Sequence, residues 1–130
     1  MQRPKEEDLG LVKKLRDAVM QEYGKMKNEV EVGEVSIVTA LVDEDIEKLV
    51  LLALQKAERP LSWREIKAVF AGVVGEDRLR RILGSLKARN MVAELTHTRY
   101  FLPEYVPLSE ISRIKNPGII NKVLQLSRRR

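Results

Sequence analysis

Apolar residues recur every three or four positions from about Lys5 to Met26. This spacing predicts a first amphipathic helix, because residues three and four apart share one face of a helix. Between Glu29 and Val42 the pattern changes to an alternation of β-branched residues. Such alternation is typical of extended chain, so we expect one strand or a loose hairpin in this stretch.

A second helix is predicted over residues 44–58. The acidic residues Asp43, Glu44 and Asp45 precede it, and we expect them to supply an N-cap and a negative first turn that complements the helix dipole. The middle of this helix, Leu49–Leu54, is apolar on every side. A helix with that pattern is packed on most sides, which predicts that it forms the centre of the core.

A short helix is predicted over residues 63–70. Ser62 and Glu65 stand three residues apart at its start, in the spacing of a capping box, where each side chain accepts from the other's backbone N–H. The same period places Trp63 with the apolar face, so we interpret it as a core residue rather than a platform for a ligand. Residues 71–75 contain two glycines and predict a turn.

A further helix is predicted over residues 76–89, with Asn90 as its C-terminal stop. Its apolar side chains fall within one narrow arc, which comprises Leu79, Ile82, Leu83 and Leu86. Two short apolar runs follow, 91–95 and 99–102, on either side of a polar turn that contains His97. This arrangement predicts a β-hairpin.

The remainder of the chain shows helical signals again. Ser109 is positioned to cap a brief turn that extends to Ile114, and Asn116 precedes a proline in the manner of a helix N-cap. A last helix is therefore predicted over residues 117–127. It carries too many apolar side chains for a free tail, so we expect it to dock on the domain or on a second copy of the chain.

Composition narrows the functional classes. The chain has 130 residues, of which 44% are hydrophobic and 33% charged, a size typical of one domain. It contains no cysteine and one histidine, which excludes thiolate catalysis, Cys/His zinc sites and histidine-based triads of this chain's own residues, although a carboxylate site for a hard cation stays open. The sequence shows neither a glycine-rich phosphate loop nor a carboxylate pair in a recognisable catalytic frame. We therefore expect no cofactor and no enzymatic activity.

Charge is distributed unevenly along the chain. The net charge is +5; acidic side chains predominate in residues 1–58 and basic ones in residues 59–130, which end in three arginines. A basic half of this kind favours a polyanion, either nucleic acid or an anionic membrane surface. No run of 18 apolar residues and no charged-then-apolar leader is seen, so we expect a cytoplasmic protein without a membrane partner.

The order helix, short helix, turn, basic helix and hairpin over residues 43–102 resembles the winged helix-turn-helix superfamily. The segments that carry the resemblance are DEDIEKLVLLALQKA, LSWREIKAVF, GEDRLRRILGSLKARN and MVAELTHTRYFLP. It implies an α+β, mostly helical fold. The chain would then divide into an N-terminal extension (1–42), a winged-helix domain (43–104) and a basic helical extension (105–130).

In that superfamily the third helix commonly enters the DNA major groove, the second crosses the backbone, and the hairpin touches the minor groove or flanking phosphates. Helical geometry places the centre of the third helix's outer face at Gly84 and Ala88, whose small side chains would allow close approach to a duplex. The resemblance implies DNA contacts by Arg64, Lys67, Arg78, Arg81, Ser85, Lys87 and Arg99. A solvated, arginine-rich helix face is the alternative.

We expect a double-stranded DNA-binding protein, either a transcription regulator or a chromatin-associated factor. An alternative is a winged-helix protein–protein interaction module in a replication, transcription or membrane-remodelling complex. RNA binding is less favoured because six aromatic residues leave few for base stacking.

Winged-helix DNA binders of this size often pair through helices that flank the domain, so the resemblance also implies a homodimer through the terminal helices. The candidate seams are two apolar stripes, which could equally close over the domain's own core. They comprise Val12, Leu15, Val19, Tyr23 and Met26 in the first stripe and Ile120, Val123 and Leu124 in the second.

Overall fold

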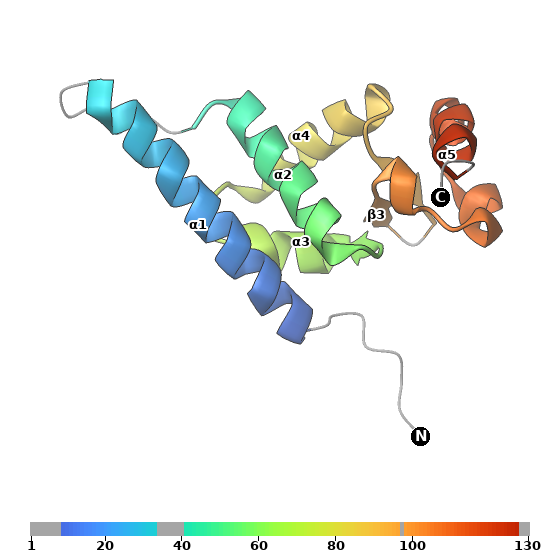
Figure 1. The fold of residues 1–130 in the computed structure, drawn as a ribbon, viewed down its shortest axis with the longest axis horizontal. Helices are drawn as coiled ribbons and strands as arrows, with labels where there is room; N and C mark the ends of the chain where they lie inside the picture. The colour runs from blue at the N-terminus through green and yellow to red at the C-terminus, as the bar shows by residue number, and fades with distance from the viewer. Residues whose placement is uncertain (1–8, 34–40, 97, 128–130) are drawn as a thin grey trace.

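The computed structural model of the chain describes residues 9–33, 41–96 and 98–127. The fold is α+β and mostly helical, as the sequence predicts, with one small antiparallel sheet. Three helices, α1, α2 and α3, cross one another at one end, and the sheet and the C-terminal helices lie at the other (Figure 1).

Helix α1 (Leu9–Gly33) is longer than the sequence predicts. The expected strand or hairpin between Glu29 and Val42 is wrong for residues 29–33, which continue the helix, and residues 34–40 lie outside the described part. Once a helix is nucleated, each added residue gains a backbone hydrogen bond, so the weak β preference of two valines does not end it.

The buried stripe of α1 packs against α2 and α3. Val12, Leu15 and Val19 have their side chains buried in the same core as those two helices. Arg16 reinforces this contact, because its Nη1 donates to the backbone carbonyl of Ala71 at 2.6 Å, just past the end of α3. Helix α1, which belongs to the predicted N-terminal extension, therefore contributes to the core shared with α2 and α3.

Helix α2 (Asp43–Ala57) occupies the centre of the core, as its all-round apolar pattern predicts. The expected side-chain N-cap is wrong. The N-cap position is Val42, which makes no side-chain cap bond, and the three acidic residues form the first turn instead. Negative charges in the first turn complement the helix dipole, as the sequence predicts. Glu58 ends the helix in a left-handed conformation.

Helix α3 (Trp63–Phe70) begins with the predicted capping box. The Glu65 backbone N–H donates to Ser62 Oγ at 3.1 Å, and the Ser62 N–H donates to Glu65 Oε1 at 3.0 Å. Glu65 is buried and its second oxygen accepts from Arg59 Nη2 at 2.6 Å, so the buried carboxylate is fully paired.

Helix α4 (Glu76–Ala88) follows the predicted turn, in which Gly72 adopts a φ of +82°. The predicted arc of four apolar residues is buried against the core, so this interpretation is confirmed. Asn90 follows with a φ of 59°, the left-handed conformation that ends many helices.

The sheet has three strands in the order β1–β3–β2, all antiparallel. The predicted hairpin is confirmed as β2 (Ala93–Leu95) and β3 (Arg99–Phe101). The two-residue strand β1 (Leu61–Ser62), which the sequence does not predict, pairs with β3 just before α3 begins. It ties the start of α3 to the hairpin.

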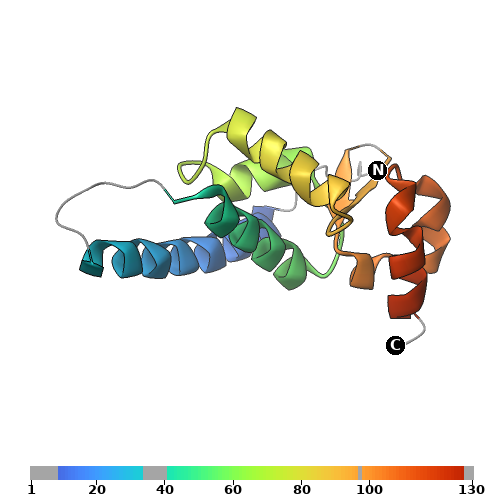
Figure 2. The ribbon, with the colours of Figure 1, turned by 90° about the horizontal axis from the view of Figure 1, so that it is seen from above.

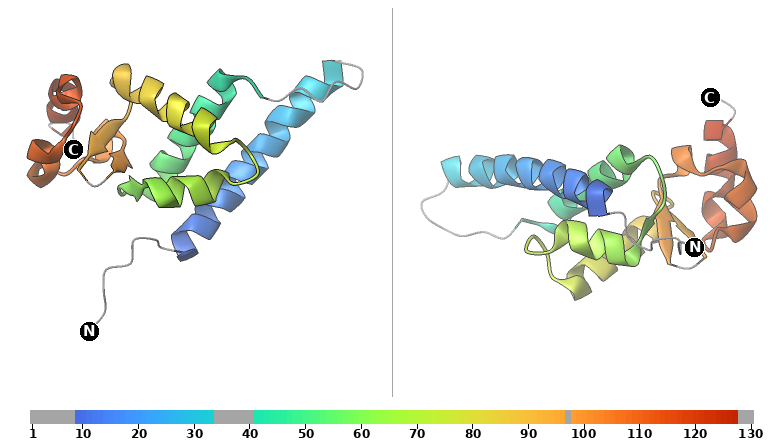
Figure 3. Two further views of the ribbon diagram at one scale, coloured as in Figure 1. Left: turned by 180° about the vertical axis from the view of Figure 1, so that it is seen from behind. Right: turned by 90° about the horizontal axis from the view of Figure 1, so that it is seen from below.

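The C-terminal segment comprises three 3₁₀ turns, η1 (Pro103–Tyr105), η2 (Leu108–Arg113) and η3 (Pro117–Ile119), and helix α5 (Ile120–Ser127). The predicted last helix is confirmed, with a 3₁₀ first turn. Its apolar face packs on the sheet in a second, smaller core cluster of Ala93, Leu95, Phe101, Val106, Ile119 and Val123. Views from above and from behind place this segment at the far end of the molecule from the end of α1 (Figures 2 and 3).

The expected cap at Ser109 is wrong, because Pro107 is the N-cap of η2. Asn116 takes the predicted N-cap position directly before Pro117, but its side chain makes no cap bond. The Asn116 amide is used elsewhere, because its Oδ1 accepts from the Glu94 N–H at 2.9 Å and its Nδ2 donates to the carbonyl of Val92 at 3.0 Å. Asn116 therefore fastens the C-terminal segment to the sheet.

Candidate nucleic-acid interface

The outer face of α4 carries the residues that the sequence assigns to it. Arg81, Gly84, Ser85 and Ala88 are exposed on the side opposite the buried arc. A Cβ added at Gly84 would meet no atom within 4 Å, so the centre of this face is open. An exposed helix face with small central residues permits close approach of another macromolecule.

Arg78 lies at the edge of this face and is held by the protein itself. Its Nε donates to Asp43 Oδ1 at 2.7 Å, and its Nη2 donates to the Leu41 carbonyl at 2.6 Å. The side chain is 29% exposed. Arg78 therefore joins the first turn of α4 to the start of α2.

Arg81 points to the same carboxylate but is held more loosely. Its Nη2 donates to Asp43 Oδ2 at 3.4 Å, and 68% of the side chain is exposed. The hydrogen bond from Arg78 is the largest cause that lowers the pKa of Asp43, and the charges of both arginines add to it. Asp43 is the acceptor shared by the two predicted DNA-binding arginines.

Lys67 and Arg80 flank the indole ring of Trp63, where α3 lies beside the start of α4. The Lys67 Nζ lies 5.8 Å and the Arg80 guanidinium 5.0 Å from the ring centroid, within cation–π range. Both cations also pair with Glu76, at 3.9 Å and 3.2 Å. Trp63 packs against the core as predicted but is only partly buried, because its ring also supports these two cations.

Lys87 is directed toward the sheet. Its Nζ lies 2.6 Å from Glu94 Oε1, and Lys115 lies 3.5 Å from the other oxygen of the same carboxylate. Glu94 is nearly buried, with 8% of its side chain exposed, so it needs these partners. Lys87 therefore serves the packing of α4 on the sheet.

Arg99, in β3, is also paired internally. Its Nε donates to the Thr96 carbonyl at 3.1 Å and its Nη2 donates to Glu110 at 3.4 Å. Arg64 is exposed on α3. His97 and the three terminal arginines lie outside the described residues.

The seven predicted contact residues thus fall into separate groups. Arg78 and Arg81 meet at Asp43, Lys67 lies against Trp63, and Lys87 and Arg99 lie in ion pairs beside the sheet. The set of predicted residues omits two arginines on the exposed side of α4.

Arg80 and Arg89 are the arginines that the prediction omits, and both are exposed. Helical spacing in the sequence could have indicated where both arginines lie. Arg80 stands four residues after Glu76, and Arg89 stands four residues after Ser85, so each shares a helix face with an exposed residue. Arg89 also forms an ion pair of 2.7 Å with Glu47 of α2. Arg80 and Arg81 of α4, and Arg89 at its C-cap, are thus exposed near its small-residue centre.

Within the described residues, no group of three or more histidine, aspartate or glutamate side chains is placed to hold a metal ion. The helices that the structure describes also include none with the length and apolar character needed to cross a membrane.

The stripe predicted as a dimer seam on α1 packs against its own domain at Val12, Leu15 and Val19. On α5, Val123 is buried in the second core cluster while Leu124 is exposed. Dimerisation stays a prediction, and on α5 it would have to use the side that Leu124 occupies.

Comparison of the chain with protein-family models, with curated proteins and with solved structures found no match.

Proposed function

We propose that the chain is a winged helix-turn-helix protein that binds duplex DNA, as a transcription regulator or chromatin-associated factor. The order α2, α3, α4 and the β2–β3 hairpin is the order that the resemblance implies, and the short strand β1 adds a third strand beside β3. It supports a role for α4 as the helix that enters the major groove and for the β2–β3 hairpin as the wing.

The observation that carries this proposal is the outer face of α4. Gly84, Ser85 and Ala88 keep its centre low, and Arg81 stands four residues before Ser85 on the same side of the helix. Arg89, the C-cap residue four positions after Ser85, is paired with Glu47 at 2.7 Å. Small central residues let a helix seat deeply in a groove, and arginines beside them can reach guanine edges or phosphates.

The predicted contact residues differ in the internal ion pair that each would have to break to reach DNA. Arg78 and Lys87 would have to leave carboxylates at 2.7 Å and 2.6 Å to reach DNA, whereas Arg81 would give up only a 3.4 Å contact. We therefore assign the principal contacts to Arg81 and Ser85. To reach flanking phosphates, Arg80 and Lys67 beside Trp63 would have to leave Glu76, at 3.2 Å and 3.9 Å.

The experiment is fluorescence anisotropy with a random-sequence duplex at several salt concentrations. The test variant is Ser85→Glu, whose new carboxylate lies within helical reach of Arg81 and Arg89 and should leave the helix folded. The control is Gln21→Glu, which makes the same charge change at an exposed position of α1, four residues before Lys25.

We expect the wild type to bind with an affinity that falls steeply with salt, because bound phosphates release counterions. Ser85→Glu should weaken binding by about tenfold or more, as one bidentate base contact or two phosphate contacts are lost. Gln21→Glu should stay within about twofold of the wild type, because α1 and α4 lie on different sides of the molecule (Figure 2).

Two results would contradict the proposal. One is the absence of salt-sensitive binding to any duplex, and the other is equal affinity of the two glutamate variants. Either would favour the protein-interaction module, for which the internal neutralisation of Arg78, Lys87 and Arg99 is the supporting observation.

A further inference from the structure

Two carboxylates of α2 lie beside the arginines of α4. Asp43 pairs with Arg78 at 2.7 Å and with Arg81 at 3.4 Å, near the start of α4. Glu47, one helical turn further along α2, pairs at 2.7 Å with Arg89, the C-cap residue of α4. Three arginines at or near the outer face of α4 are therefore held by acidic residues of one neighbouring helix.

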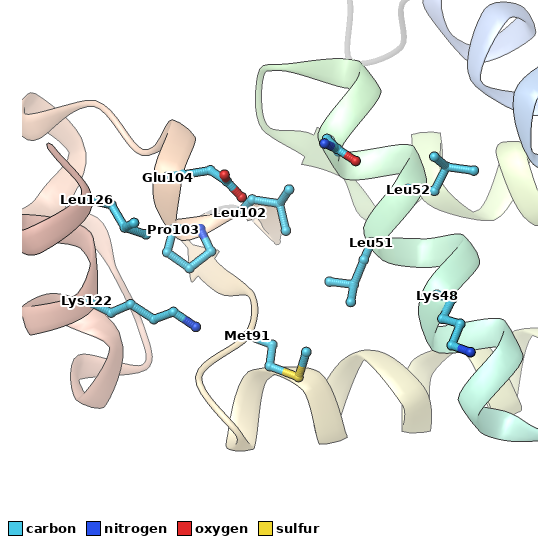
Figure 4. A pocket seen from close by; sticks show the side chains of 10 residues that line it. Lys48, Leu51, Leu52, Met91, Leu102, Pro103, Glu104, Lys122 and Leu126 are labelled. Carbon is cyan, nitrogen blue, oxygen red and sulfur yellow. The ribbon is translucent and has the colours of Figure 1, made fainter. Parts of the chain in front are cut away.

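The side of α2 that carries these carboxylates changes character where α4 ends. Four residues after Glu47, Leu51 lies on the same side of α2 and lines a groove together with Met91, which follows α4 (Figure 4). Across this groove lies the C-terminal segment. The acidic part of this side of α2 thus lies beside α4, and the apolar part lies beyond it.

The two carboxylates differ in how far solvent reaches them. The Glu47 side chain is 19% exposed, whereas that of Asp43 is 48% exposed. Most of the Arg81 side chain is exposed as well, so its contact with Asp43 lies at the protein surface. A long ion pair at the surface contributes little and opens easily. Asp43 and Arg81 therefore form a pair that an approaching anion can reach.

A DNA phosphate and the Asp43 carboxylate would compete for the same guanidinium, because both are anions that accept from arginine N–H groups. Arg78 holds Asp43 at 2.7 Å, so the carboxylate stays beside α4 when Arg81 leaves it. A phosphate bound to Arg81 would then lie close to a like charge, which repels it. Asp43 thus opposes binding twice, through the ion pair that must open and through the charge that remains.

We propose that Asp43 restrains DNA binding by α4, as an internal competitor of the phosphate for Arg81. This inference rests on the proposed function, because it concerns the same helix face. It adds an acidic residue of a different helix that sets how tightly α4 holds a duplex.

The test variant is Asp43→Asn, which removes the charge and keeps an oxygen that can accept from Arg78. Its matched control is Glu44→Gln, which removes the same charge from the same exposed turn of α2 but leaves the partner of Arg81 in place. Both variants are also made in an Arg81→Ala background. Each protein is titrated with a random-sequence duplex by fluorescence anisotropy at several salt concentrations, and its urea unfolding shows that it is folded.

We expect Asp43→Asn to bind the duplex about fivefold more tightly than the wild type, and Glu44→Gln to stay within about twofold of it. The logarithmic salt dependence of Asp43→Asn should steepen by up to about one unit, because Arg81 becomes available to one more phosphate. In the Arg81→Ala background the two variants should bind alike, because the guanidinium for which Asp43 competes is absent and Arg78 is still held by the Leu41 carbonyl.

Three results would overturn the inference while the wild type still binds duplex DNA. They are equal affinities of Asp43→Asn and Glu44→Gln, a gain from Asp43→Asn that persists without Arg81, and weaker binding by Asp43→Asn. Weaker binding would mean that the carboxylate orients Arg81 toward DNA instead of competing for it. Absence of duplex binding by both the wild type and Asp43→Asn would instead contradict the proposed function, and this inference with it.

Discussion

Arg78 donates a hydrogen bond of 2.7 Å to the carboxylate of Asp43, so α4 and α2 are joined by one of the arginines that the sequence assigns to DNA. The same guanidinium donates to the Leu41 carbonyl at 2.6 Å. Arg78 is thus part of the free protein's structure, and its effect on stability can be separated from any effect on binding.

The first prediction compares Arg78→Ala with Arg81→Ala. Arg78→Ala should lower the free energy of unfolding by roughly 1 kcal/mol through the lost bond to the Leu41 carbonyl, whereas Arg81→Ala, whose contact is long and exposed, should change it much less. Urea unfolding followed by circular dichroism measures both. Equal losses for the two variants would mean that the Leu41 bond contributes nothing.

The second prediction concerns acid. The pKa of Asp43 is lowered, first by the hydrogen bond from Arg78, so the folded state binds this proton less readily than the unfolded state. The stability from the Asp43 contacts is therefore present above the unfolded pKa of about 3.9 and is lost as the pH falls below it. Urea midpoints between about pH 6 and pH 2.5 should show a shallower acid decline for Asp43→Asn than for the wild type.

The matched control for this titration is Asp17→Asn, which removes one exposed carboxylate from α1. A decline in Asp43→Asn as steep as that of the wild type would assign the acid sensitivity to other groups.

The third prediction tests how the C-terminal segment is attached. Asn116→Ala removes three hydrogen bonds, to Glu94, Val92 and Lys87, and leaves partly buried backbone groups without partners. We expect a loss of about 1–3 kcal/mol in the free energy of unfolding, measured in urea. Asn121→Ala, at an exposed position of α5, is the control and should change it by less than about 0.5 kcal/mol. Similar losses of unfolding free energy in both variants would contradict the inference that Asn116 fastens the C-terminal segment to the sheet.

The fourth prediction uses two glycines in different conformations. Gly84→Ala should stabilise the protein by about 0.5–1 kcal/mol, because Gly84 is inside a helix and its added Cβ meets no neighbour. Gly72→Ala should destabilise it by roughly 1 kcal/mol, because Gly72 has a φ of +82°. Thermal unfolding compares the two, and a destabilised Gly84→Ala would show that the open face of α4 is crowded.

Local signals determined most of the helices. The spacing of apolar residues places α2, α3 and α4 to within a residue or two, because helical period is written directly in the chain. The capping box at Ser62 and Glu65 is equally local, since both partners stand within one turn. The hairpin follows from two short apolar runs on either side of a polar turn.

Only the tertiary structure decided the pairings between distant residues. Strand β1 exists because Leu61 meets Tyr100, and two residues have no strand signal of their own. Asn116 follows the local pattern of a cap, yet its amide bonds the backbone of the sheet instead, because the docked C-terminal segment places Glu94 and Val92 within its reach.

In the candidate interface, too, some features follow from the local sequence and others only from the tertiary structure. The sequence alone determined the outer face of α4, since helical geometry fixes which residues lie opposite the buried arc. Tertiary structure decided which cations on it are already used, because Asp43 and Glu94 belong to other elements and their charges become neighbours of Arg78 and Lys87 only when the chain folds. Side-chain period is a property of the local backbone, whereas a charge's partner is a property of the whole fold.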